Sequence, residues 1–181
     1  MKIEKYLPTI IKKTIYDIDF DTLYKNGKRY LIFDIDNTLI PYDKAIATTK
    51  VHELIAMLQS QGFTIILMSN NKKYRVRKVA EDLDVKGFSW SLKPWQTGFK
   101  KVLKHLGNPP KAEVITIGDQ IMTDIRGANK AGLDSVLVMP IKSKTEKWYT
   151  KLNRHIEKKI IKEIEVKNKL IYKELIEKHE Y

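Results

Sequence analysis

The sequence predicts an α/β fold, a three-layer sandwich in which a central, mainly parallel sheet is covered by helices on both faces. Five short apolar runs, rich in β-branched residues, alternate with stretches of helical periodicity, and strands joined through helices in this way run parallel. The length of 181 residues suits one domain with a full hydrophobic core and is short for two. We expect a single domain over residues 1–181, with a core at about 28–140, an N-terminal segment at 1–27 and a tail at 141–181.

The elements of the first half follow from the spacing of apolar residues. Residues 2–18 are interpreted as a short amphipathic piece before the sheet begins. Strands are expected at 29–34 and 63–69, because both runs are apolar and rich in β-branched residues. The helix between them, at 48–62, has apolar residues at helical spacing and is closed by Gly62.

The second half repeats this alternation of helix and strand. By the same criteria, helices are expected at 71–83, 95–107 and 122–132, and short strands at 87–90, 113–118 and 135–139. Two prolines, Pro109 and Pro110, mark the loop before one of these strands.

The tail after Pro140 is basic and has a long helical periodicity. From Lys142 to Tyr181 it holds twelve Lys and Arg against seven Glu. Its apolar residues recur mostly at steps of three or four: Tyr149, Leu152, Ile156, Ile160, Ile164, Ile171 and Leu175. We interpret it as one or two amphipathic helices, which either meet an anionic membrane or pack on the sheet as ordinary core helices.

Composition excludes several kinds of site. The chain has no cysteine, which excludes disulfides, thiolate metal sites and cysteine nucleophiles. Its four histidines lie apart in charged, helical stretches, which argues against zinc. No apolar run is long enough to span a bilayer, and the first residues lack the pattern of a signal peptide, so a cytoplasmic location is expected. The formal charge of +12 attracts anions but does not by itself identify the anionic partner.

Polar residues gather where the predicted strands end. In chain order they are Asp34, Asp36, Asn37 and Thr38, then Ser69, Asn70 and Asn71, then Lys93, then Asp119, Thr123 and Asp124. In open α/β sheets the loops at the carboxyl ends of the strands form the functional crevice. We therefore expect these side chains to form one site at one edge of the sheet.

The acids of this group predict a site for a hard cation. Asp34 and Asp36 flank one apolar residue directly after a strand, while Asp119 and Asp124 add negative charge from another strand end. Clustered carboxylates need a cation or a proton to be tolerated. Oxygen ligands without cysteine or histidine are typical of Mg²⁺, and Lys93 suits an anionic group that bridges to that metal.

The order of these motifs resembles that of the phosphatases of the haloacid dehalogenase (HAD) superfamily. DIDNT, SNN, a lysine and GDQIMTD follow one another from Asp34 to Asp124. Each motif is weak alone, and the order of all four at the strand ends carries the resemblance. The resemblance implies a HAD-like Rossmannoid fold, a magnesium cofactor and the hydrolysis of phosphate monoesters.

By this resemblance, Asp34 is the nucleophile that forms an aspartyl-phosphate, and Asp36 is the general acid that protonates the leaving oxygen and then activates water. Mg²⁺ would be held by Asp34, the backbone carbonyl of Asp36 and Asp119, while Asp124 orients the water shell of the metal or Lys93. The residues expected at the substrate phosphate are Thr38, which also braces the nucleophile loop, with Ser69, Asn70 and Lys93.

Structural interpretations stand beside these roles. Four residues at the strand ends would equally suit the capping of turns and helices: Asn37, Thr38, Asn70 and Asn71. Asp124 could be a surface acid on a helix, paired with Lys130 or Arg126, and Lys93 could be a surface lysine. The two tryptophans that bracket Lys93 are interpreted as packing residues.

Finer details resemble the YqeG-type branch of capless (subclass III) HAD phosphatases, which is similar to the phosphatidylglycerophosphate phosphatases. The stretches that carry this resemblance are LPTIIKKTIYDI, DIDNTLIPYD, LMSNN, SLKP, GDQIMTDIRGAN and RHIEKKI. About thirty residues between Asp36 and Ser69 leave no room for a large cap domain. The resemblance implies a phospholipid headgroup as substrate and a role in phospholipid biosynthesis. Peripheral contact with the inner face of an anionic membrane would suit such a substrate, and the oligomeric state stays open.

Three alternatives were weighed. A receiver domain also gathers acids and a lysine around magnesium, but it lacks an acid two residues after its phosphoacceptor. A non-catalytic basic module that binds nucleic acid would account for the charge, yet no RNA motif, recognition-helix signature or zinc knuckle is present. Within the enzymes, the alternative is a capless phosphatase that acts on nucleic-acid ends, nucleotides or phosphoproteins.

Overall fold

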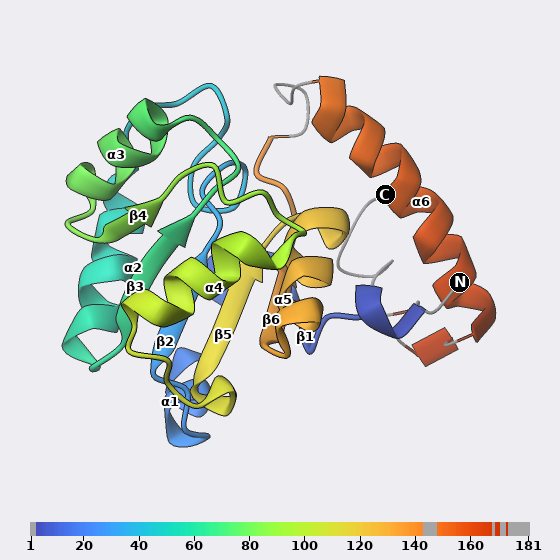
Figure 1. Cartoon of the computed structure of the whole chain (residues 1–181), viewed down its shortest axis with the longest axis horizontal. Coiled ribbons are helices and arrows are strands. Elements are labelled where there is room, and N and C mark those ends of the chain that lie inside the picture. Colours follow the sequence, from blue (N-terminus) through green and yellow to red (C-terminus); the bar gives the residue numbers. More distant parts are fainter. Residues whose placement is uncertain (1–2, 143–147, 168, 171–172, 174–181) are drawn as a thin grey trace.

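The centre of the protein is a six-stranded sheet in which each strand runs parallel to its neighbours. A computed structural model of the chain describes residues 3–142, 148–167, 169–170 and 173. The strands are β1 (Ile10–Lys12), β2 (Tyr30–Phe33), β3 (Thr64–Met68), β4 (Lys86–Phe88), β5 (Val114–Gly118) and β6 (Asp134–Val138). They lie in the order β1-β6-β5-β2-β3-β4 (Figure 1). The predicted parallel α/β sheet and its five predicted strands are confirmed.

Helices cover both faces of this sheet, which gives the predicted three layers (Figure 1). One face packs against α1 (Phe20–Lys25), α2 (Thr49–Ser60) and α3 (Lys73–Asp82). The other face packs against α4 (Gln96–His105) and α5 (Arg126–Ala131). Three short 3₁₀ helices are η1 (Ile3–Tyr6), η2 (Ile15–Asp17) and η3 (Lys111–Glu113). A π-helical turn, η4 (Ile121–Ile125), precedes α5. The tail forms α6 (Trp148–Lys167).

The period of two along the strands separates the two cores. In β2, Leu31 and Phe33 face the core beside α2 and α3, whereas Ile32 faces the core that contains Phe99 of α4. Successive side chains of a strand point to opposite faces, so one apolar strand supplies both layers. This burial on both sides explains why the central strands are almost continuously apolar.

The N-terminal segment differs from its prediction as an amphipathic piece outside the sheet. Its residues Ile10–Lys12 form β1, an edge strand that pairs with β6 in the register Ile10↔Val136. The next turn, η2, is held by a capping box in which the Thr14 side chain accepts from Tyr16 N and Asp17 accepts from Thr14 N. A three-residue strand carries too little periodicity to be recognised, and only its pairing partner identifies it.

The C-terminal helix packs on the rest of the protein. Ile160, Ile161 and Ile164 of α6 are buried against Tyr6 and Ile121, among other residues of the same cluster. Glu157 is buried as well and accepts a hydrogen bond from Met122 N at 2.9 Å. Of the two interpretations of the tail, packing as a core helix is therefore correct for this part of α6. Ile171 and Leu175 of the predicted apolar stripe lie outside the described residues.

None of the helices that the structure describes is long and apolar enough to cross a bilayer. The described chain between β2 and β3 contains only a loop and α2, and α3 alone lies between β3 and β4. The expected lack of a large cap domain between Asp36 and Ser69 agrees with this architecture.

Candidate active site

The candidate site lies at the carboxyl edge of the three central strands. Phe33 at the end of β2 is in register with Leu67 of β3 and with Ile117 of β5. The residues that follow these strands therefore emerge side by side, because neighbouring parallel strands end at the same edge. Asp34 and Asp119 follow β2 and β5 directly.

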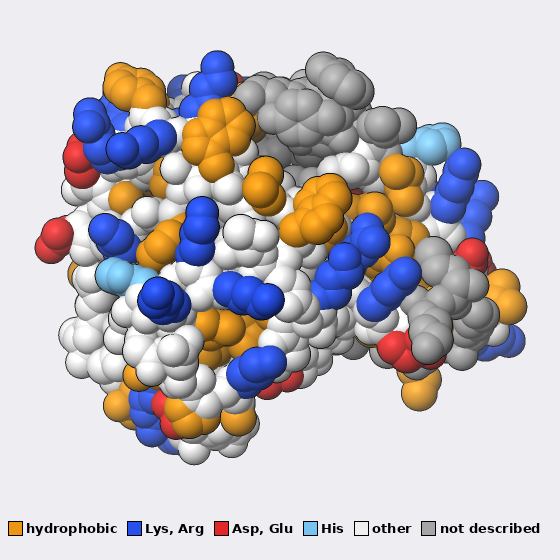
Figure 2. All heavy atoms as spheres, in the orientation of Figure 1, with side chains coloured by type: hydrophobic (Ala, Val, Ile, Leu, Met, Phe, Trp, Pro, Cys, Tyr) orange, Lys and Arg blue, Asp and Glu red, His pale blue; other side chains and the backbone are white. Residues whose placement is uncertain are grey.

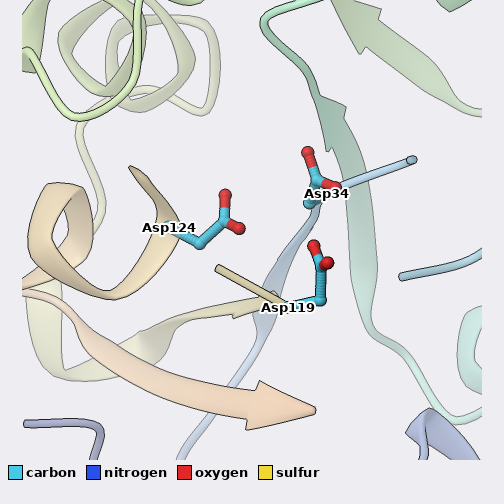
Figure 3. A group of neighbouring side chains, drawn as sticks. All are labelled: Asp34, Asp119 and Asp124. Carbon is cyan, nitrogen blue, oxygen red and sulfur yellow. The ribbon is translucent and has the colours of Figure 1, made fainter. Parts of the chain in front are cut away.

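Three buried carboxylates meet at this edge. Asp34, Asp119 and Asp124 each offer a carboxylate oxygen, and these oxygens lie within 4.8 Å of one another (Figure 3). Asp124 comes from η4, where its Oδ2 accepts from Gln120 N at 3.1 Å. Gly118 permits this approach, since a Cβ there would lie 2.4 Å from Asp124 Cγ. The alternative interpretation of Asp124, as a surface acid paired with Lys130 or Arg126, is thus wrong.

Lys93 is buried among these acids, so its interpretation as a surface lysine is also wrong. Its Nζ lies 2.6 Å from Asp34 Oδ1 and 2.6 Å from Asp124 Oδ1, and it donates to Met68 O at 2.8 Å. Burial lowers the pKa of Lys93, but the charges of Asp124 and Asp34 outweigh it, so the pKa lies above its ordinary value. The lysine stays protonated and joins two of the three carboxylates.

The electrostatics of the cluster suit a cation. Burial raises the pKa of the Asp34 carboxyl well above its ordinary value, and Lys93 opposes this shift. Asp124, Asp119 and Asp36 add to the rise, because each places negative charge near Asp34. Within the part of the chain that the structure describes, Asp34 Oδ2 is buried without a hydrogen-bond partner. Three buried carboxylates against one ammonium leave excess negative charge, so the residues present fit a divalent hard cation.

Asn70 holds the loop that carries Lys93. Its Nδ2 donates to Lys93 O at 2.9 Å, and its Oδ1 accepts from Lys93 N at 2.7 Å. Trp90 and Leu92 in this loop have positive φ values of 49° and 54°, a backbone conformation that residues other than glycine rarely adopt. The loop is thus fixed by Asn70 from one side and by the close packing of Gly98 on Ser91 from the other.

Asp36 is held by a different set of partners. Arg75 Nε donates to its Oδ1 at 2.6 Å, while Ser69 Oγ and Asn71 Nδ2 each donate to its Oδ2 at 3.2 Å. Arg75 also donates to the backbone of the loop after β2, to Lys44 O at 2.6 Å. The carboxylate of Asp36 thus has its own hydrogen bonds, one of them to Arg75 of α3, and it is not a member of the group formed by the other three acids.

The remaining predicted residues brace the nucleophile loop. Thr38 is buried, and its hydroxyl donates to Asp119 Oδ1 at 3.2 Å. Asn37 has a φ of 65°, and its Oδ1 accepts from Tyr42 N at 3.3 Å. A cavity of about 80 Å³ lies over the site and is lined by, among others, Asp34, Asp36, Ser69, Asn70, Lys93 and Asn153 of α6.

Comparison with known proteins decides the family. The family model of the haloacid dehalogenase-like hydrolases matches residues 41–132. The chain belongs to this family. The matched segment contains Lys93 and Asp119, and the fold places Asp34, which precedes it, 2.6 Å from Lys93 Nζ and beside the carboxylate of Asp119. The predicted superfamily is confirmed.

Relatives of this HAD hydrolase extend over most of the chain. It is 28% identical over 169 residues to the probable phosphatase YqeG of Bacillus subtilis, covering 93% of this chain and 97% of that protein. It is 26% identical over 168 residues to phosphatidylglycerophosphate phosphatase 1 of Arabidopsis thaliana, covering 86% of this chain and 47% of the relative, or about half of its length. The prediction of a phosphatase of this family is confirmed.

Solved structures show the same fold. An uncharacterized protein from Listeria monocytogenes serotype 4b aligns with a TM-score of 0.53 and 19% identity, over 66% of this chain and 85% of that one. The HAD-hydrolase YfnB of Bacillus subtilis, solved with bound magnesium, aligns with a TM-score of 0.51 and 17% identity, over 61% and 86%. At these identities the likeness concerns the fold alone.

Sequence reasoning missed two features of this HAD site. Arg75 was not singled out, although a residue in the first turn of a helix that follows β3 must lie near the same edge of the sheet. Trp90 and Trp95 were expected to be packing residues, which is wrong: they are 56% and 65% exposed. The Lys93 loop presents them to solvent because its backbone, and not its aromatic side chains, packs on α4.

Proposed function

We propose that this HAD hydrolase is a magnesium-dependent phosphomonoesterase that uses Asp34 as its nucleophile and phosphatidylglycerophosphate as its substrate. The proposal rests on the surroundings of the two carboxylate oxygens of Asp34. One of its oxygens lies 2.6 Å from Lys93 Nζ, and the other is buried beside a polar cavity with no hydrogen-bond partner among the residues that the structure describes. An oxygen in this condition is available for bonding to a metal or to phosphorus.

We assign the metal to the carboxylates of Asp34 and Asp119 and to the backbone carbonyl of Asp36. Magnesium, when bound, would neutralise the phosphoryl oxygens and align them for in-line attack. For Asp124, which lies 2.6 Å from Lys93 Nζ, we favour the role of orienting that lysine. Lys93 in turn would offset the charge shared between Asp34 and the phosphate.

The reaction proceeds in two displacements. First, an oxygen of Asp34 bonds to phosphorus as the bond to the ester oxygen breaks, and Asp36 gives its proton to the leaving alkoxide. Then Asp36 takes a proton from a water molecule, the water oxygen attacks phosphorus, and the bond to Asp34 breaks to release phosphate. Arg75, Ser69 and Asn71 occupy both oxygens of Asp36. Proton transfer therefore requires Asp36 to break its hydrogen bond with at least one of these three residues.

The four residues expected at the phosphate divide into two groups. Ser69 and Lys93 line the cavity, and we assign both to the phosphoryl oxygens. Thr38 and Asn70 use their side chains to bind Asp119 and the backbone of Lys93. We therefore propose that these two position other groups, with no direct side-chain contact to phosphate.

The lipid substrate is supported by the relatives and by the form of the site. Two relatives, from Arabidopsis thaliana and Chlamydomonas reinhardtii, are named phosphatidylglycerophosphate phosphatase and are each 26% identical to this chain. A site without an inserted cap leaves the unreactive part of a large substrate outside. The proposal includes a cytoplasmic enzyme in peripheral contact with an anionic membrane, towards which a formal charge of +12 is attracted.

A phosphate-release screen tests the proposal. The wild type and Asp34→Asn are compared on phosphatidylglycerophosphate in mixed micelles, nucleotides, phosphorylated DNA ends and phosphopeptides, each with and without Mg²⁺. We expect turnover of the lipid, dependence on Mg²⁺ and no turnover in the variant, because an amide is a far poorer nucleophile. Faster turnover of a nucleic-acid or peptide substrate would replace the lipid. Turnover by the variant at the wild-type rate would remove Asp34 from its role.

A further inference from the structure

Next to the catalytic cavity lies a second, larger cavity of about 290 Å³. The two share four lining residues, from four different segments: Asn70, Lys93, Thr123 and Asn153. They therefore adjoin, and one ligand can occupy both. The remaining described walls of the second cavity come from the Lys93 loop, from η4 and from α5, and none of the described lining residues is acidic.

Two cations face this second cavity, Arg126 and Lys130. They lie four positions apart on α5, so their side chains project from the same side of the helix. Within the described part of the chain, neither forms an ion pair with a carboxylate. This distinguishes them from Arg75 and Lys93, which are both paired with acids.

The arginine is held in place while its donors are left unused. Its guanidinium carbon lies 5.7 Å from the centroid of the Tyr6 ring, a contact that orients the planar group. Among the described residues, its Nε is buried without a hydrogen-bond partner. An oriented guanidinium with unsatisfied donors beside an ammonium is the arrangement that binds phosphate oxygens well.

Part of the wall of this cavity is apolar. Pro94, Trp95 and Met122 line the same cavity, and they suit a carbon spacer next to the anion. In Figure 2 the face that carries α4 and α5 shows mainly Lys and Arg among its charged side chains, so a second negative charge is also favoured by the surrounding surface.

We propose that Arg126 and Lys130 form a second phosphate subsite, which selects phosphomonoesters that carry another phosphate group across a short carbon spacer. The inference rests on the proposed function, since the first phosphate must occupy the cavity at Asp34. The second group is a phosphodiester or a phosphomonoester, and it belongs either to a phospholipid headgroup or to a soluble bisphosphate.

The test uses Arg126→Gln/Lys130→Gln and the single variant Lys130→Gln, which changes an exposed side chain. Lys100→Gln/Lys101→Gln is the matched control, because it removes the same charge from exposed positions on α4 that line neither cavity. Three substrates are compared: phosphatidylglycerophosphate in mixed micelles, its deacylated soluble headgroup with both phosphates, and glycerol 3-phosphate with one.

We expect the double variant to raise KM for both two-phosphate substrates by roughly 10- to 100-fold with little change in kcat, the range for losing charge-assisted hydrogen bonds to one phosphate. Lys130→Gln should give part of this effect, and the control none. Kinetics on glycerol 3-phosphate should not change.

The other outcomes separate the subsite from the proposed function. An equal loss on all three substrates, or no loss on any, would overturn the subsite while phosphatase activity stands. A loss on the lipid without a loss on its soluble headgroup would overturn it too, and would assign both cations to the membrane surface. If the wild type releases phosphate from none of the three, the proposed function itself fails.

Discussion

The substitution Gly98→Ala tests whether packing of α4 sets the position of Lys93, to which we assign a catalytic role. Gly98 lies inside α4, where alanine would ordinarily stabilise a helix by about 1 kcal/mol. Here the added Cβ would lie 2.3 Å from Ser91 O and 2.9 Å from Ser91 Cβ. Both atoms belong to the loop that carries Lys93, so either that loop or α4 has to move.

The expected cost combines two opposing effects. Overpacking typically costs about 1–3 kcal/mol, so after the helical gain the net loss of stability is at most about 2 kcal/mol. Activity should fall much further, because Ser91 is two residues from Lys93, whose Nζ lies 2.6 Å from Asp34. A displacement of about 1 Å at a reacting group lowers the rate by on the order of 100-fold.

Thermal unfolding and kcat/KM on a small soluble phosphate measure the two effects separately. Lys101→Ala, on an exposed position of the same helix, controls for helix propensity. We expect Gly98→Ala to lower the melting temperature by a few degrees and kcat/KM by on the order of 100-fold. A variant more stable than wild type with unchanged kcat/KM would refute the reasoning, because the loop would then tolerate the methyl group.

Three further predictions concern the metal, the proton shuttle and the tail. Chelation with EDTA should abolish phosphate release, and added Mg²⁺ should restore it. Asp119→Ala should raise the Mg²⁺ concentration needed for half-maximal rate by at least about tenfold. Activity that persists in chelator would contradict the proposed magnesium site. Arg75→Ala removes the hydrogen bonds to Asp36 Oδ1 and to the backbone of the loop at Lys44. It should lower kcat more for alkyl phosphates than for p-nitrophenyl phosphate, because poor leaving groups depend most on protonation. Equal losses for the two substrates would exclude a role of Arg75 through Asp36. Ile164→Ala should lower the free energy of unfolding by about 2–5 kcal/mol, because that side chain is fully buried on α6; denaturant unfolding that matches wild type would mean that α6 is not docked in solution.

The sequence determined the parallel sheet and the grouping of the site because both depend on local patterns. Continuous apolar runs and helices of period 3.6 are patterns of neighbouring residues, and the alternation of strand and helix then favours parallel strands. Once the strands are parallel, whatever follows them lies at one edge. Asp34, Ser69, Lys93 and Asp119 could therefore be grouped without any knowledge of their distances.

Only the tertiary structure decided the contacts that act between distant segments. Arg75 reaches Asp36 from 39 positions away, and Asn70 clamps the backbone of Lys93 from 23 positions away. The short strand β1 exists because β6 offers it a free edge, and α6 docks because Ile160 and its neighbours meet an apolar surface at η4. In each case the stabilising free energy comes from contact with a partner remote in the chain. The local pattern of one segment therefore does not predict the contact.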